Sequence, residues 1–112
     1  MMPFEAGDII RIAFPHVETG RVRSRPALVV STKPLGPDND LIWAMMITNI
    51  ERASWPGDIA LRDHKQLGLP IASKVRTHKI ATLESAGAVK IGQIDDVTLS
   101  AVQGVIRQYL GG

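Results

Sequence analysis

The sequence predicts a mainly β protein with one C-terminal helix, folded as a small antiparallel barrel. Short apolar runs end at proline, glycine or Asn/Asp-rich turns, and no helical segment long enough for a parallel crossover separates them. Only residues 95–110 show helical periodicity. A chain of 112 residues has room for one modest core, so we expect a single domain over residues 1–112.

The predicted strands are residues 9–14, 24–31, 41–47, 58–61, 71–79 and 89–94, with a further apolar segment at 80–83. Residues 41–47 are apolar without interruption, which predicts a central strand buried on both faces, with Trp43 in the core. Residues 64–69 are expected to form a single helical turn or a loop. In the C-terminal segment Asp95 or Asp96 can cap a helix, and glycines 111 and 112 can end it.

One cation and a proline stand directly before the apolar run 27–30. Pro26 fixes its own φ and favours extended geometry at Arg25, so the guanidinium should project from a rigid strand start. Such a forked, charged donor suits a phosphate group. The alternative is an ordinary ion pair of Arg25 with Asp8 or Glu18 across the sheet.

Residues 15–24 are polar, basic and without apolar periodicity, which predicts a long loop with a binding or lid role. Arg21 and Arg23 in this loop are expected to contact phosphates nonspecifically or to keep the loop solvated. Further along, the strand 71–79 alternates, with Ser73, Val75 and Thr77 on one face. Its other face, which includes Lys74, Arg76 and His78, is unusually basic.

Composition excludes several classes of protein. The chain has no cysteine, which removes disulfides, thiol nucleophiles and cysteine-ligated zinc. Three scattered histidines form no recognisable ligand set, so we expect neither a metal nor a cofactor. No apolar run has the length of a membrane span and no signal peptide is recognisable, so a cytoplasmic location is expected. A net charge of +2, concentrated in the first third, suits a polyanionic partner.

Several motifs occur in a fixed order: GDII at 7–10, RPALVVS at 25–31 after the basic loop, SKVR at 73–76, IATL at 80–83 and IGQI at 91–94. Together they resemble the PemK/MazF family of toxin endoribonucleases from bacterial toxin–antitoxin systems, over nearly the whole chain. The resemblance implies an SH3-like barrel, a homodimer, a cognate antitoxin protein, and metal-independent cleavage of single-stranded RNA by attack of a ribose 2′-hydroxyl on the adjacent phosphate.

The resemblance also implies site residues. The family's catalytic arginine matches Arg25, and a family threonine at the end of the third strand matches Thr48. An arginine and, two residues later, an aspartate serve the site in the PemK branch. Arg76 matches this arginine, but His78 stands where the aspartate would be.

The chemistry needs a base near the 2′-hydroxyl, an acid near the leaving oxygen, and donors on the phosphate. Arg25 and Arg76 suit the phosphate, whereas His16 and His78 are the candidates for proton transfer because an ordinary histidine pKa is about 6.5. Trp55 is expected either to stack on an RNA base or an antitoxin side chain, or to pack beneath the turn at 56–57.

Two alternatives to an active nuclease stay open. The family's barrel resembles that of a gyrase-poisoning toxin, so the chain is alternatively a non-catalytic module acting on a protein target. The third hypothesis is a weakened nuclease that binds RNA or an antitoxin without useful turnover, because of the residue at position 78.

Overall fold

A six-stranded antiparallel sheet and one C-terminal helix make up the fold, as the sequence predicted. The computed structural model describes residues 4–15 and 22–112. The elements are β1 (Asp8–Pro15), β2 (Val22–Val29), β3 (Leu41–Asn49), β4 (Ile59–Leu61), β5 (Ser73–Glu84), β6 (Val89–Gln93) and α1 (Asp96–Tyr109). Two predicted bounds were wrong. Residues 73–84 form one long strand, β5, which joins the predicted strand to the apolar segment after it. The loop predicted at 15–24 is shorter because Pro15 and Val22 already pair.

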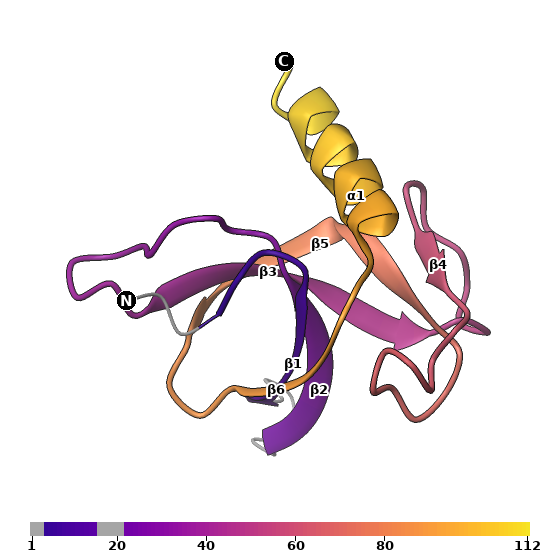
Figure 1. Cartoon of the computed structure of the whole chain (residues 1–112), viewed down its shortest axis with the longest axis horizontal. Helices are drawn as coiled ribbons and strands as arrows, with labels where there is room; N and C mark the ends of the chain where they lie inside the picture. The colour runs from indigo at the N-terminus through magenta and orange to yellow at the C-terminus, as the bar shows by residue number, and fades with distance from the viewer. Residues whose placement is uncertain (1–3, 16–21) are drawn as a thin grey trace.

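The strand order is β4-β5-β3-β2-β1-β6, and every neighbouring pair is antiparallel. In Figure 1, β1, β2 and β6 run across the direction of β3 and β5, so the sheet curls into a half-barrel, and α1 stands over β5. The curl brings both faces of the central strands into contact with apolar side chains. β4 and β6 are the two edges of the sheet.

The pairing of β3 with β5 contains a bulge. Met46 pairs with Arg76, whereas the preceding residue, Met45, pairs with Ile80. Three residues of β5, numbers 77–79, therefore have no partner on β3. Such an insertion bends a strand and breaks the alternation of its side chains.

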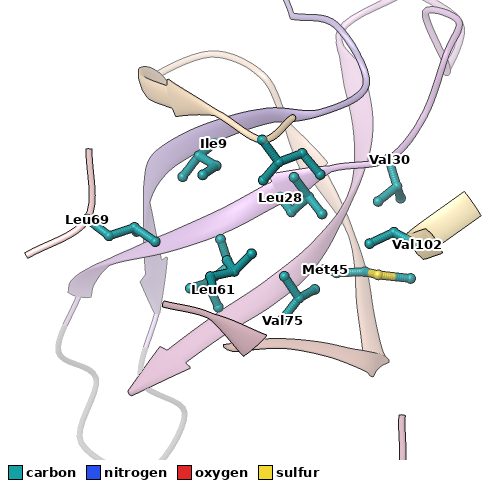
Figure 2. Close-up of a cluster of buried hydrophobic side chains, with 10 residues drawn as sticks. Ile9, Leu28, Val30, Met45, Leu61, Leu69, Val75 and Val102 are labelled. Carbon is teal, nitrogen blue, oxygen red and sulfur yellow. The ribbon is translucent and has the colours of Figure 1, made fainter. Parts of the chain in front are cut away.

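The first core lies inside the curl of the sheet, where Figure 2 shows side chains from several strands and from α1 converging. Its fully buried members include Ile9, Leu28, Val75 and, from the helix, Val102. A helix that places one apolar stripe on a sheet buries it in this way. The predicted amphipathic helix therefore covers the open side of the sheet.

A second core uses the alternate residues of the same strands, including Ile10, Ala27, Val29 and Met46, with Phe4 packed against them. Because successive side chains in a strand point to opposite faces, β1, β2 and β3 are buried on both sides. The prediction for Trp43 was wrong, since its side chain is 48% exposed. An apolar run indicates a central strand, but it does not show at which residue the side chains that pack over the strand end.

The helix begins as predicted, with Asp95 as its cap. The carboxylate of Asp95 accepts a hydrogen bond of 2.7 Å from the backbone N–H of Thr98, and this bond lowers the pKa of Asp95. No helix in the described part of the chain is long and apolar enough to cross a membrane.

Two glycines allow the segment before β5 to reach the edge strand β6. Gly68 has a φ of +74°, and a Cβ at this position would overlap the carbonyl oxygen of Ile91. A Cβ on Gly92 would likewise overlap the carbonyl oxygen of Leu67. The two backbones thus touch at a point that only glycine permits, and residues 67–68 fill the gap beside β6.

Gly68→Ala is expected to destabilise the protein by about 3 kcal/mol or more, because it adds a backbone clash to the strain of a positive φ. The matched control is Gly87→Ala, where φ is +82° but no atom lies within 4 Å of the added Cβ. The control should cost only about 1–2 kcal/mol. Urea unfolding of both variants measures the difference, and equal losses would contradict the close approach at residue 68.

Candidate functional site

Arg25 and Thr48 lie at the same end of the sheet and on the same face. The paired region of β2 and β3 ends at Ala27 and Met46, and each of the two residues lies two positions beyond it. Ala27 and Met46 both belong to the second core, so alternation places Arg25 and Thr48 on that core's face. Both side chains are half-buried. They are therefore held by the sheet while remaining accessible.

The alternative considered for Arg25, an ion pair with Asp8, does not form. The carboxylate of Asp8 is buried and contacts Lys90 at 3.1 Å, and it also accepts a hydrogen bond from the backbone N–H of Glu5 at 2.8 Å. Glu18, the other partner considered, lies outside the described residues. Among the described side chains, Arg25 makes no ion pair. No described carboxylate therefore neutralises the guanidinium of Arg25.

β5 adds two cations to the same face. Thr48 pairs with Lys74 and Met46 pairs with Arg76, and residues directly opposite one another in a ladder share a face. The basic character of this face was predicted, but both side chains are buried, with exposed fractions of 5% and 9%. Burial of two like charges side by side requires an anion close to them.

That anion is Asp58, which directly precedes β4. Its Oδ2 lies 3.2 Å from Nη1 of Arg76 and 3.6 Å from Nζ of Lys74, and it accepts a hydrogen bond of 2.9 Å from the backbone N–H of Trp55. Within the described residues the other oxygen, Oδ1, is buried and accepts no hydrogen bond. One carboxylate thus pairs with both buried cations, which leaves the cluster with a net positive charge, and closes the turn 55–58.

The same two cations hold the loop between β3 and β4, residues 50–58. Arg76 donates from Nη2 to the carbonyl oxygen of Ala53 at 2.8 Å, and Lys74 donates to the carbonyl oxygen of Arg52. The guanidinium of Arg76 also lies 4.3 Å from the ring centroid of Trp55, as a cation–π contact. Arg76 therefore acts on the loop in this structure, through hydrogen bonds from both of its terminal nitrogens.

A second set of contacts joins this loop to the helix. The hydroxyl of Thr77 donates to the carbonyl oxygen of Gly57 at 2.8 Å, and its oxygen lies 2.7 Å from the hydroxyl of Tyr109. Because the proton of Thr77 is already used, Tyr109 is the donor in the second bond. The ring of Tyr109 also meets the His78 imidazole edge-on, 4.9 Å between centroids.

The structure does not bring all the predicted site residues together. His78 was predicted to share a face of its strand with Arg76. Instead its exposed imidazole packs on Tyr109, which Thr77 also contacts, because the bulge after Arg76 breaks the alternation of the strand. Trp55 is 43% exposed and packs on the guanidinium of Arg76, so stacking on an RNA base or an antitoxin side chain stays a prediction. His16 and Arg21 lie outside the described residues, and for Arg23 the structure describes only the backbone, in β2.

Other possible sites are separate or lacking. In the described ranges no group of three or more histidine or acidic side chains has an arrangement that could hold a metal. A pocket of about 530 Å³ opens between residues 60–67 and the start of α1, and neither Arg25, Thr48 nor Arg76 lines it. The candidate site is therefore an open surface at the strand ends, suited to an extended ligand.

Sequence reasoning missed Asp58 and Tyr109 as parts of this region. Asp58 is 18 residues from Arg76 and Tyr109 is 32 residues from Thr77, so no local motif connects either pair. A signal was present for Asp58. A carboxylate at the start of a strand next to the basic strand 71–79 is the expected counter-ion once β4 and β5 are paired.

The fold and the site together define a class of protein: a small basic half-barrel that presents an accessible arginine and a threonine at one end of its sheet. Residues 5–110 match the model of a family described as PemK-like, MazF-like toxin of type II toxin–antitoxin system. The chain belongs to this family, whose members include endoribonucleases. A comparison with curated proteins gives no match.

Solved structures with the same fold include MazE–MazF complexes from Deinococcus radiodurans. One crystal form has a TM-score of 0.76 at 24% identity, over 99% of this chain and 98% of that chain. A second form has a TM-score of 0.69 at 25% identity, over 97% of both chains. A mycobacterial endoribonuclease in complex with its cognate antitoxin has a TM-score of 0.70 at 19% identity, over 96% of this chain and 95% of that chain.

Proposed function

We propose that this protein is a toxin that cleaves single-stranded RNA without a metal ion and thereby inhibits translation and growth. Family membership supports the class of activity. The observation that carries the proposal is the placement of Arg25 and Thr48. They lie together at one strand end, half-buried, on a face made positive by β5. A rigid cation beside a hydroxyl donor, open to solvent, is suited to hold a phosphodiester.

In the proposed reaction the ribose 2′-oxygen attacks the adjacent phosphorus and the bond to the 5′-oxygen breaks. A base takes the 2′-proton, and an acid gives a proton to the leaving 5′-oxygen. The products are a 2′,3′-cyclic phosphate and a 5′-hydroxyl. Arg25 stabilises the negative charge that develops on the phosphate oxygens, and Thr48 donates to one of them or positions the sugar. Arginine keeps its proton, so a histidine carries the proton transfer.

Arg25→Ala is expected to lower RNA cleavage at least a hundredfold, in line with the loss of one transition-state donor. The fold should be retained, because the side chain is only half-buried at a strand end. Sequencing of RNA ends after incubation with wild type and variant gives both the rate and the chemistry. Arg107→Ala, an exposed change on α1, is the control. Intact RNA with wild type, together with inhibited DNA supercoiling, would instead favour a gyrase-directed toxin.

Among the described residues, His78 is the histidine considered for proton transfer, and its imidazole is exposed. His78→Ala is expected to reduce kcat at least tenfold, and His78→Asp to retain part of the activity with a pH optimum shifted downward. The pH profile of kcat for the three proteins is the measurement. A rate increase with Asp and no change with Ala would remove His78 from the mechanism and favour a weakened nuclease.

We also propose that the chain forms a homodimer and binds a cognate antitoxin protein. The solved relatives described as complexes with MazE or with a cognate antitoxin support the second part. An antitoxin segment that is disordered alone and folds over the basic face would block RNA binding. Light scattering of the purified protein is expected to give twice the chain mass. Mass spectrometry of material purified from its native cells should identify the antitoxin, and a monomer without a bound protein would contradict both parts.

A further inference from the structure

We propose that residues 52–58 form a preorganised stacking platform for an RNA base, and that Asp58 is the positioning residue that fixes the Trp55 ring in it. The inference rests on the proposed RNA-cleaving function and adds to it a residue that touches neither the phosphate nor the sugar. Lys74, Arg76 and Asp58 form a buried charge cluster whose stability contribution does not explain its presence.

Three ionised side chains are buried at this cluster, and one carboxylate oxygen within it has no hydrogen-bond donor among the described residues. Removing such groups from water costs about as much as their attraction returns, so apolar side chains of similar size would stabilise the fold at least as well. The cluster is therefore poorly explained as a stabilising device. The hydrogen bonds of the cluster indicate a different role, because all of them are made with the loop between β3 and β4.

Each of the three charged groups fixes the loop at a different position. Lys74 donates a hydrogen bond to the carbonyl oxygen of Arg52, and Arg76 donates one to the carbonyl oxygen of Ala53. Asp58 accepts one from the backbone N–H of Trp55. Near the C-terminal end of the loop, the hydroxyl of Thr77 donates a hydrogen bond to the carbonyl oxygen of Gly57. Four hydrogen bonds in six residues leave the loop little freedom, although it lies at the edge of the sheet (Figure 1) and its residues 51–57 are exposed.

The loop leaves Trp55 43% exposed, although one face of its ring is covered. That face rests on the guanidinium of Arg76, at 4.3 Å. Stacking of a base on an aromatic ring contributes about 1–3 kcal/mol, and a ring already fixed in place loses less entropy when it binds. The ring also lies next to the strand, β5, that carries cations on the Arg25 face. A nucleotide near the scissile phosphate is thus the ligand class that the platform fits.

Asp58→Asn keeps the shape of the side chain but leaves two buried cations without an anion, so it should release the loop. Asp63→Asn is the matched control, because Asp63 is an exposed carboxylate that makes no ion pair among the described residues. In a Trp43→Phe background Trp55 is the only tryptophan. Acrylamide quenching of its fluorescence is expected to increase about twofold in Asp58→Asn and to stay unchanged in Asp63→Asn.

Cleavage kinetics test the function of the platform. Trp55→Ala is expected to raise KM for a short single-stranded RNA about tenfold, the loss of roughly 1.4 kcal/mol of stacking, with kcat within twofold. Asp58→Asn should raise KM about as much, and the double variant no further, because both changes remove the same platform. Trp55 is exposed, so Trp55→Ala should fold even if Asp58→Asn does not.

The outcomes separate the two proposals. An unchanged KM in Trp55→Ala, or additive effects of the two changes, would overturn the platform while leaving the nuclease intact. Unchanged quenching in Asp58→Asn would overturn the positioning role of Asp58. Uncut RNA with wild-type protein would overturn the proposed function itself.

Discussion

The antiparallel pairing of β3 with β5 is the constraint on which the rest of the molecule depends. It is the longest ladder in the described sheet, and it joins the strand that ends at Thr48 to the strand that carries Lys74 and Arg76. Because opposite residues share a face, this register decides that the cations lie beside the threonine and not on the helix side. The bulge after Arg76 then turns residues 77 and 78 toward α1. A single pairing therefore sets two chemically different surfaces on one strand.

The buried cation and the accessible cation lie on two strands, β5 and β2, that flank β3 in the sheet. Arg25, on β2, is held by the sheet and free of carboxylates among the described side chains, whereas Arg76 is held by Asp58 and the loop carbonyls. In the sequence the two arginines look similar, because each lies in a predicted strand that also contains apolar residues. Their surroundings give them different tasks, with one available to a ligand and the other organising the loop that carries Trp55.

Much of the fold could be predicted because its signals are local. Apolar runs between breakers marked the strands, and the spacing of Val102 and its neighbours, with Asp95 before them, marked the helix and its start. The errors came from tertiary context. Trp43 is exposed because its covering ends along a strand that the sequence shows only as continuously apolar. The burial of Lys74 and Arg76 depends on a carboxylate that only the pairing of β4 with β5 brings near.

The candidate site was predictable in part for the same reason. The strand-end position of Arg25 could be predicted because a proline and an apolar run mark it. The contact of His78 with Tyr109 depends on a bulge that alternation does not reveal.

The contact of Gly68 with Gly92 also bears on how the protein limits aggregation through its sheet edges. An open sheet leaves unpaired backbone groups along both edge strands, and these are templates for pairing with other chains. Here the edges are short, three residues in β4 and five in β6, and the backbone of residues 67–68 lies directly against β6. A foreign strand therefore finds few backbone groups to pair with at either edge. The glycine pair adds a covering segment over β6, so the half-open barrel limits edge-to-edge aggregation without closing.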